Sequence, residues 1–141
     1  SPNSTNVIPG RVFFRADLRH PDADLLDGME GEFQAACEKI TADLGLKLDF
    51  NRIWYSEPVT FDEACVNAVQ EAANALGHAN RPITSGAGHD AVYVSRVAPT
   101  AMIFIPCEDG ISHNEIEEAT PGDLAAGCDV LLNAMVSRAN T

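Results

Sequence analysis

The apolar run TAMIFIP, residues 100–106, constrains the fold of this chain more than any other segment. A nearly uninterrupted apolar stretch of this length is typical of a strand that helices cover on both faces, as in a parallel sheet. Helical apolar patterns stand on both sides of it, one ending at Gly77 and one following Thr120. The second half of the chain is therefore predicted to alternate helix and strand in α/β layers.

Local signals place the helices of this second half. Thr60 is predicted to cap the first helix, with Glu63 completing a capping box. Thr120 is predicted to cap the last helix, and Pro121 suits the first helical position because an N–H there has no helical partner. Between them, residues 90–97 are predicted to form a short helix.

A different pattern occupies the first half. Residues 6–20 alternate apolar and mostly polar side chains, as a half-buried strand does. Residues 22–44 repeat apolar side chains at helical spacing and end at Gly45, and a second alternating strand follows over residues 46–51. The prediction is a β-α-β unit, which we expect to need further strands because two strands alone make a marginal sheet. A boundary is predicted near residues 56–60.

The balance of charges narrows the possible partners. Lysine and arginine number 9 against 21 acidic residues, for a net charge of −12. Phosphate backbones and anionic membrane surfaces both attract clustered basic residues, so we expect no nucleic-acid partner and no membrane partner. No apolar run approaches the roughly 20 residues that span a bilayer.

The cysteines, at positions 37, 65, 107 and 128, stand far apart with no CxxC pair. Free buried cysteine behaves as a small apolar residue, so the pattern favours a reducing, cytoplasmic location over a disulfide framework. The chain opens SPNSTNVIPG, with no initiator methionine and no helix or strand leading in. We expect it to be cut from a longer protein, the alternative being a natural start trimmed of a tag.

Two of the histidines lie in short loops that contain glycine. His89 follows Gly-Ala-Gly in SGAGHDA, residues 85–91, where the backbone can approach a ligand closely. It is a candidate to donate a hydrogen bond to a developing oxyanion, the alternative being a histidine that caps the next helix. His113 follows the apolar run 100–106 and is a candidate metal ligand, the alternative being a solvated loop histidine. Glu117 could orient His113 or be one more solvated acid.

The polar face of the first predicted strand supplies a candidate anion site. Arg19 shares that face with Arg15 and Asp17. A planar guanidinium binds carboxylates through two parallel hydrogen bonds, so Arg19 could hold an anionic ligand with help from Asn6. The alternative is a solvated row of charges, with Asn6 satisfying its own turn.

Three stretches together resemble a known family: PNSTNVIPGRVFFRADLRHPD, residues 2–22, then SGAGHDA, and then PCEDGISHNEIEEATPGDLAAGCDVL, residues 106–131. They are similar to the C-terminal portion of the M20-type amidohydrolases. Within these they are most similar to N-carbamoyl-L-amino-acid hydrolases, allantoate amidohydrolases and β-ureidopropionases. The resemblance covers nearly the whole chain and is weakest over residues 22–44.

The resemblance implies two parts. Residues 1–56 would be the second half of a lid domain that dimerises, a partial ferredoxin-like β-α-β unit of α+β type. Residues 57–141 would be the C-terminal stretch of an α/β metal-dependent catalytic domain. A homodimer is implied, and so is a small-molecule substrate that carries a carboxylate and a ureido or carbamoyl group.

The resemblance also implies roles for named residues. The asparagine before VIPG and the arginine of DLRH, which bind the substrate carboxylate, fall on Asn6 and Arg19. His89 is implied to contact the substrate and stabilise the oxyanion, and His113 to be a late metal ligand. A pair of divalent ions, zinc, manganese or cobalt, would hold the water that attacks the ureido or amidine carbon, with a glutamate as general base.

Two classes of function follow. The first is a metal-dependent hydrolase of N-carbamoyl-L-amino acids or allantoate, which releases an amino acid or a ureidoglycine-type product, ammonia and CO2. The second is a catalytically inactive dimerisation or binding module derived from such an enzyme, and an M20 aminoacylase or dipeptidase is a further alternative. The family's other metal ligands and its general base lie upstream of the matched stretches, so we expect the 141-residue chain alone to be inactive.

Overall fold

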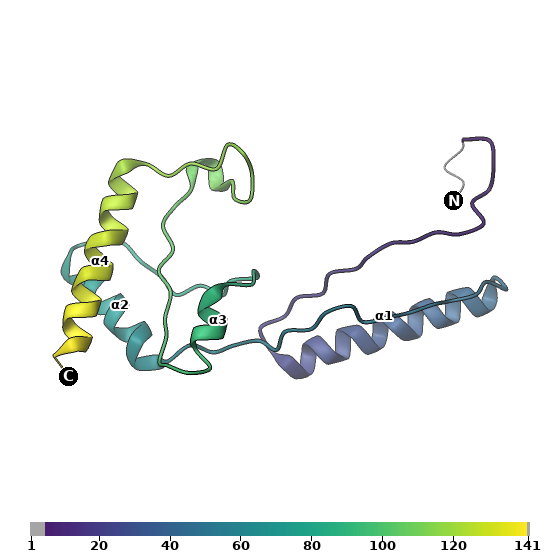
Figure 1. Cartoon of the computed structure of the whole chain (residues 1–141), viewed down its shortest axis with the longest axis horizontal. Coiled ribbons are helices and arrows are strands. Elements are labelled where there is room, and N and C mark those ends of the chain that lie inside the picture. Colours follow the sequence, from purple (N-terminus) through teal and green to yellow (C-terminus); the bar gives the residue numbers. More distant parts are fainter. Residues whose placement is uncertain (1–4, 141) are drawn as a thin grey trace. The chain divides into compact units, whose positions relative to one another are not determined.

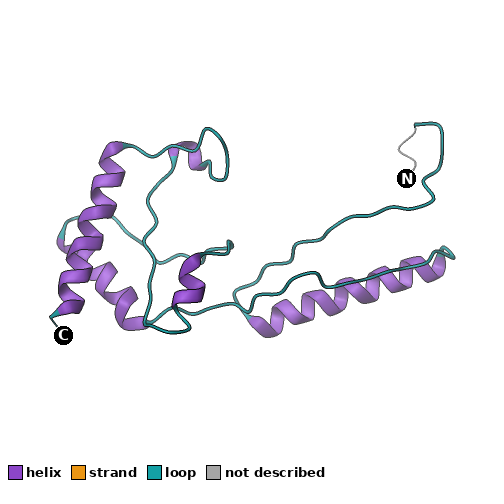
Figure 2. Ribbon diagram, in the orientation of Figure 1, coloured by secondary structure: helices purple, strands orange, loops and turns teal. Residues whose placement is uncertain are grey.

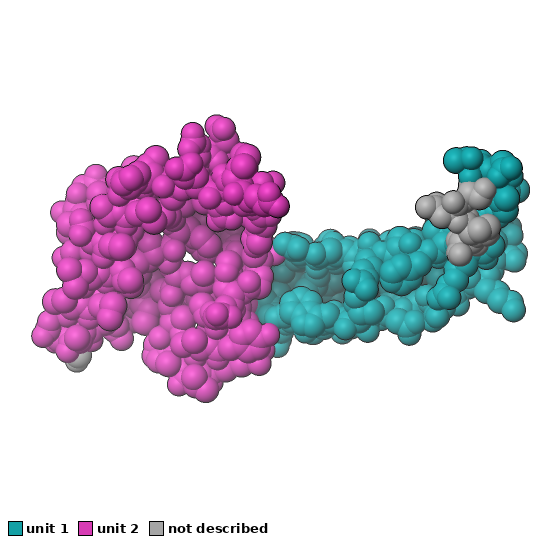
Figure 3. Space-filling view, turned by 45° about the horizontal axis from the view of Figure 1, so that its top comes forward, with its two compact units in different colours: residues 1–58 teal, residues 59–141 magenta. Residues whose placement is uncertain are grey.

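The computed structural model describes residues 5–140 of the chain. Backbone contacts divide the chain into two compact units, residues 1–58 and residues 59–141, which Figure 3 colours separately. Among the described residues, unit 1 holds one helix, and unit 2 holds three α-helices and a short 3-10 helix.

Unit 1 is built around α1, which runs over Ala23–Asp43. Asp22 caps its start, where the side chain accepts a hydrogen bond of 3.0 Å from the backbone N–H of Leu25. Just after the helix, Gly45 adopts a left-handed φ of 65°, a conformation that glycine reaches at little cost. The helix predicted over residues 22–44 is confirmed.

The segment after α1 runs back along the helix (Figure 1). Phe33 of the helix and Phe50 of the segment are in ring contact, with centroids 5.8 Å apart. Arg52 pairs with Glu30 and lies 3.7 Å from Asp27, which ties the segment to neighbouring positions on the helix. No residue of α1 is buried, so this helix contributes no closed core to the described part of unit 1.

The core of unit 2 lies between α2, Glu63–Ala75, and α4, Pro121–Ala139. Because the distance between packed helices depends on the side chains at their contact, small residues let these two approach closely. Val69 and Ile103 pack against the buried cluster, which also draws the apolar run into the core. The buried members are Ala68, Ala72 and Ala73 from α2, and Val130 and Ala134 from α4.

Gly127 of α4 fits against the apolar run. A Cβ atom at this position would lie 2.7 Å from Cγ2 of Ile105, well inside the separation at which carbon atoms attract. Only glycine can therefore occupy position 127 without moving Ile105. The absence of a side chain at this position lets Ile105 lie directly against the helix.

The two predicted helix starts have different outcomes. Thr120 caps α4, accepting a hydrogen bond from the N–H of Asp123 at 3.1 Å, as predicted. The prediction that Thr60 caps α2 is wrong, because Asp62 takes that position and accepts from the N–H of Cys65 at 2.9 Å. This hydrogen bond also lowers the pKa of the Asp62 carboxyl. The N–H of Asp62 donates to the first carbonyl of the apolar run at 3.1 Å, which keeps the chain extended up to residue 62.

The remaining helices of unit 2 are short. α3 covers Asp90–Val94 and ends at Ser95, whose hydroxyl donates to the carbonyl of Val92 at 2.9 Å. The helix predicted over residues 90–97 is right in place and extends too far at its C-terminal end. η1, Glu108–Gly110, follows the apolar run. Of the helices in residues 5–140, none is long and apolar enough to cross a membrane.

The predicted fold class is wrong. Residues 5–140 contain no strand and no sheet, so neither the β-α-β lid unit nor the alternating α/β layers are present there (Figure 2). Alternating or continuous apolar side chains indicate an extended backbone with a face to bury, but a strand also needs a neighbour that completes its ladder of hydrogen bonds. No pair of segments in this part of the chain forms such a ladder.

Candidate functional site

His89 stands immediately before α3, at the N-cap position, with extended backbone angles of φ −133° and ψ 153°. Its side chain makes no hydrogen bond to the helix, so the residue has the position of a helix cap without that function. The imidazole is half-buried, and its Nε2 lies 2.7 Å from the hydroxyl oxygen of Ser85. The ring also meets Phe104 edge-on, with centroids 5.5 Å apart. Two separate segments therefore hold the ring.

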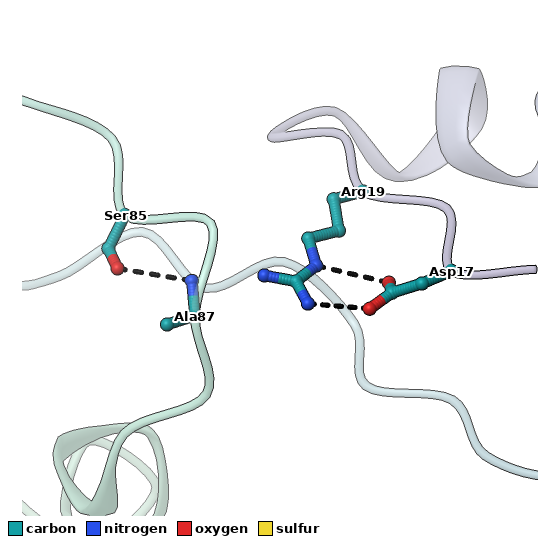
Figure 4. Close-up of polar contacts among 4 residues, drawn as sticks. All are labelled: Asp17, Arg19, Ser85 and Ala87. Carbon is teal, nitrogen blue, oxygen red and sulfur yellow. Dashed lines mark hydrogen bonds and ion pairs between the residues drawn. The ribbon is translucent and has the colours of Figure 1, made fainter. Parts of the chain in front are cut away.

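Ser85 organises the loop before His89. The N–H of Ala87 donates to Ser85 Oγ at 3.2 Å (Figure 4). Serine hydroxyls often satisfy the backbone two residues on in this way, and here the same oxygen reaches the imidazole. A side chain at Gly88 would meet nothing within 4 Å, so the space beside the backbone is open at this point. Sequence reasoning missed Ser85, although a hydroxyl four residues before a loop histidine is a signal that could have found it.

His113 lies in the loop between η1 and α4, and its side chain is exposed. Its backbone adopts φ 56°, a left-handed conformation that is uncommon for a residue with a side chain. Asp109 and Gly110, which belong to η1 just before this loop, are also left-handed. The hydroxyl oxygen of Ser112 lies 3.3 Å from Nδ1 of the imidazole. The imidazole is thus accessible, as a metal ligand must be.

Glu117 fixes the backbone of this loop. Oε2 of its carboxylate accepts a hydrogen bond of 2.7 Å from the N–H of His113, and Oε1 lies 4.0 Å from Sγ of Cys107. The sequence left open whether Glu117 orients the imidazole or is merely solvated. It acts on the main chain of His113, where a charged acceptor makes a strong hydrogen bond that holds the left-handed conformation.

The described residues do not fit a metal ion by themselves. They contain no group of three or more histidine, cysteine, aspartate or glutamate side chains placed to hold one. A zinc site in a protein takes three or four protein ligands. His113 is therefore one candidate ligand of a set that residues 5–140 do not complete.

Arg19 is paired within its own segment of unit 1. Its Nε and a terminal nitrogen donate to the two carboxylate oxygens of Asp17, at 3.0 and 2.5 Å (Figure 4). These hydrogen bonds lower the pKa of Asp17 and raise the pKa of Arg19. Both side chains are largely exposed, so water screens this ion pair. Asn6 is exposed in a turn of the same unit, whereas His89 and His113 belong to unit 2.

A cavity of about 350 Å³ opens in unit 2 between residues 59–62 and residues 95–100. Neither His89 nor His113 lines it. The cavity is therefore separate from the candidate site.

Known proteins resemble this chain over almost its whole length. It is 45% identical over 139 residues to the N-carbamoyl-L-amino-acid amidohydrolase of Rhizobium meliloti, and 38% identical over 135 residues to the allantoate amidohydrolase of Escherichia coli. These alignments cover 99% and 92% of this chain, but 33% and 32% of the relatives. A crystal structure of an amidase of the hydantoinase/carbamoylase family from Burkholderia multivorans is 56% identical, with a TM-score of 0.92 over 97% of this chain and 33% of that chain.

The named relatives are amidohydrolases, and a broader family includes them. Residues 4–137 match the model of peptidase family M20/M25/M40. The chain belongs to this family, and the resemblance to M20-type amidohydrolases is confirmed. It spans about a third of the length of the curated relatives it matches.

Proposed function

We propose that the complete protein is an amidohydrolase that cleaves the carbamoyl or ureido C–N bond of a small acid, either an N-carbamoyl-L-amino acid or allantoate. The observation that carries this proposal is the 45% identity to an N-carbamoyl-L-amino-acid amidohydrolase over 99% of the chain. The products are an amino acid or a ureidoglycine-type compound, ammonia and CO2. The similarity to an allantoate amidohydrolase supports allantoate as the second candidate substrate.

His89 is proposed to contact the substrate and to hydrogen-bond the oxygen that gains negative charge during the reaction. Its imidazole is half-buried and is contacted by Ser85 and by Phe104. A donor that is already in place needs no reorganisation as charge develops, which is why such donors stabilise the transition state. The fixed position of this ring supports the role.

His113 is proposed to be one ligand of the divalent ions, zinc, manganese or cobalt, that the complete protein would bind as a pair. Its exposed imidazole and its backbone, held by Glu117, support this role. The described residues do not complete this site by themselves. The remaining ligands would come from the two thirds of the relatives' length that this chain does not cover, so we expect the 141-residue chain alone to be inactive.

Residues 1–56 are proposed to belong to a lid domain through which the protein forms a homodimer, and residues 57–141 to the catalytic domain. The exposed apolar side chains of unit 1 support a contact surface there, because large exposed apolar patches mark interaction sites. Those exposed by more than 70% include Val12, Phe13, Ile53 and Trp54.

A second candidate function is a catalytically inactive dimerisation or binding module. The incomplete set of metal ligands among residues 5–140 favours it for this chain taken alone. An aminoacylase or dipeptidase of the same family is a further alternative, because the family as a whole is one of peptidases.

A substrate panel separates these functions. The complete protein would be incubated with N-carbamoyl-L-amino acids, allantoate, N-acyl amino acids and dipeptides, with added Mn, Co or Zn, and ammonia and free amino acid would be measured. We expect ammonia from the first two classes. Free amino acid without ammonia from the other two would identify an aminoacylase or dipeptidase, and no turnover with any metal would identify the inactive module.

Replacing Arg19 by alanine is expected to raise KM for N-carbamoyl-L-amino acids by about ten- to a hundredfold, because hydrogen bonds to charged groups contribute about 1.5–3 kcal/mol. Arg19→Lys keeps the charge but loses the planar fork, so it should also be impaired. The measurement compares kcat/KM for the acid and for a carbamoyl amine without the carboxylate. The acid should lose far more than the amine.

Arg15 supplies the matched control for this experiment. It lies four residues away in the same segment, and its guanidinium stacks 5.7 Å from the ring centroid of Phe13. Arg15→Ala should change both substrates little. Equal losses for the acid and the amine in Arg19→Ala would mean that Arg19 supports unit 1 and does not bind the substrate carboxylate.

A further inference from the structure

We propose that Ser85 is a positioning residue that fixes the tautomer of His89, so that the imidazole carries its proton on Nδ1 and offers that N–H to the substrate. The inference rests on the proposed function, in which His89 donates a hydrogen bond to the substrate oxygen. The contact that suggests this role is the 2.7 Å separation of Ser85 Oγ from Nε2 of His89.

The surroundings of the Ser85 hydroxyl favour donation to the imidazole. A hydroxyl has one hydrogen and two acceptor sites. The N–H of Ala87 uses one acceptor site, which fixes the oxygen within the loop. A hydroxyl that accepts one hydrogen bond becomes a better donor, because hydrogen bonds in a chain polarise one another. The acceptor it reaches is Nε2 of His89.

The proposed role of His89 also requires Ser85 to be the donor in this hydrogen bond. A neutral imidazole has one N–H and one acceptor nitrogen, and the partner of one nitrogen decides where the proton sits. Ser85 occupies Nε2, so Nδ1 is the nitrogen left to meet the substrate. If Nε2 held the proton, Nδ1 would present a lone pair to the developing negative charge and would repel it. Donation from Ser85 to Nε2 disfavours this tautomer, because Nε2 must then be the acceptor.

Phe104 limits the rotation of the imidazole ring. It meets the imidazole at an angle of 64° with the centroids 5.5 Å apart. Rotation of the imidazole by half a turn about its Cβ–Cγ bond would put a ring carbon in the place of each nitrogen, so it would break the bond to Ser85 and disturb the contact with Phe104. Ser85 therefore determines which nitrogen carries the proton, while Ser85 and Phe104 together determine the orientation of the ring.

The test is nitrogen-15 NMR of the complete protein labelled at histidine, which distinguishes a protonated ring nitrogen from a bare one. We expect His89 in the wild type to carry its proton on Nδ1. Ser85→Ala should shift the population toward the Nε2–H form, and Ser85→Thr, which keeps the hydroxyl, should restore Nδ1–H. Ser95→Ala is the matched control, since it removes a hydroxyl at the other end of α3 that bonds the carbonyl of Val92.

Kinetics provide the second readout. We expect Ser85→Ala to lower kcat by about tenfold, which is less than the roughly hundredfold or larger loss that removal of an oxyanion donor causes, because the imidazole remains and only its tautomer changes. KM should change little, and Ser85→Thr should recover most of the loss. An Nε2–H tautomer in the wild type, or an unchanged Nδ1–H signal in Ser85→Ala, would overturn the inference whatever the activity. If His89→Ala leaves kcat intact, the proposed role of His89 fails instead, and the NMR result still reports on Ser85.

Discussion

His113→Ala is expected to remove most of the divalent metal from the complete protein and to abolish hydrolysis of N-carbamoyl-L-amino acids. A metal site has only three or four protein ligands, so each carries a large share of the affinity. Loss of a residue that merely orients a ligand weakens metal binding about ten- to a hundredfold. Loss of the ligand itself should exceed that range. The measurement is metal content after dialysis, together with a titration of activity against added metal.

His78→Ala is the matched control, because His78 is a half-buried histidine of the same unit with no proposed role. It should retain the full metal content. If His113→Ala also retains its metal, then His113 is a solvated loop histidine, and the left-handed loop around it serves another purpose.

His89→Ala is expected to leave the metal in place and to lower kcat by about a hundredfold or more. Removal of a single oxyanion donor costs on this order, about 2.7–4 kcal/mol of transition-state stabilisation. The interaction appears only as charge develops, so kcat and kcat/KM should fall by similar factors and KM should change little. Steady-state kinetics with metal content measured in parallel would show this pattern.

The two variants together separate the two histidines. Equal loss of metal in both would show that His89 is a ligand and not an oxyanion donor. A fall in kcat/KM of His89→Ala that comes only from KM would place His89 in substrate binding alone.

Much of the helical structure could be predicted from the sequence, because its signals are local. The apolar period and Gly45 mark α1, and the pair Thr120 and Pro121 marks the start of α4. The start of α2 could not be predicted in the same way. Both Thr60 and Asp62 are good capping residues, and the choice is made by a hydrogen bond from Asp62 to the distant apolar run.

The strand predictions are wrong for a different physical reason. A pattern of side chains reports which faces of an extended segment are apolar, but pairing depends on a second segment in register. Residues 100–106 do contribute to a buried core, yet they do so against the helices α2 and α4 rather than within a sheet.

In the site, the sequence pointed to the histidines, left Glu117 open between orienting His113 and being solvated, and missed Ser85. Histidine beside glycine is visible as a motif in SGAGHDA. The bond from Ser85 to the imidazole and the bond from Glu117 to the main chain of His113 depend on loop conformations that no pattern encodes. The pairing of Arg19 with Asp17 was not predicted either, because the pattern placed both residues on one polar face without pairing them.

The packing of small residues between α2 and α4 implies that amide hydrogens of this chain exchange with solvent at two very different rates. Amides of Ala72, Ala73 and Ala134 lie in helices at buried positions, so they exchange with deuterated solvent only when the helix pair opens as a unit. The segment over residues 46–58 has no ladder of strand hydrogen bonds among the described residues, so many of its amides meet solvent continuously. Deuterium uptake should therefore separate a slow population in unit 2 from a fast one in unit 1.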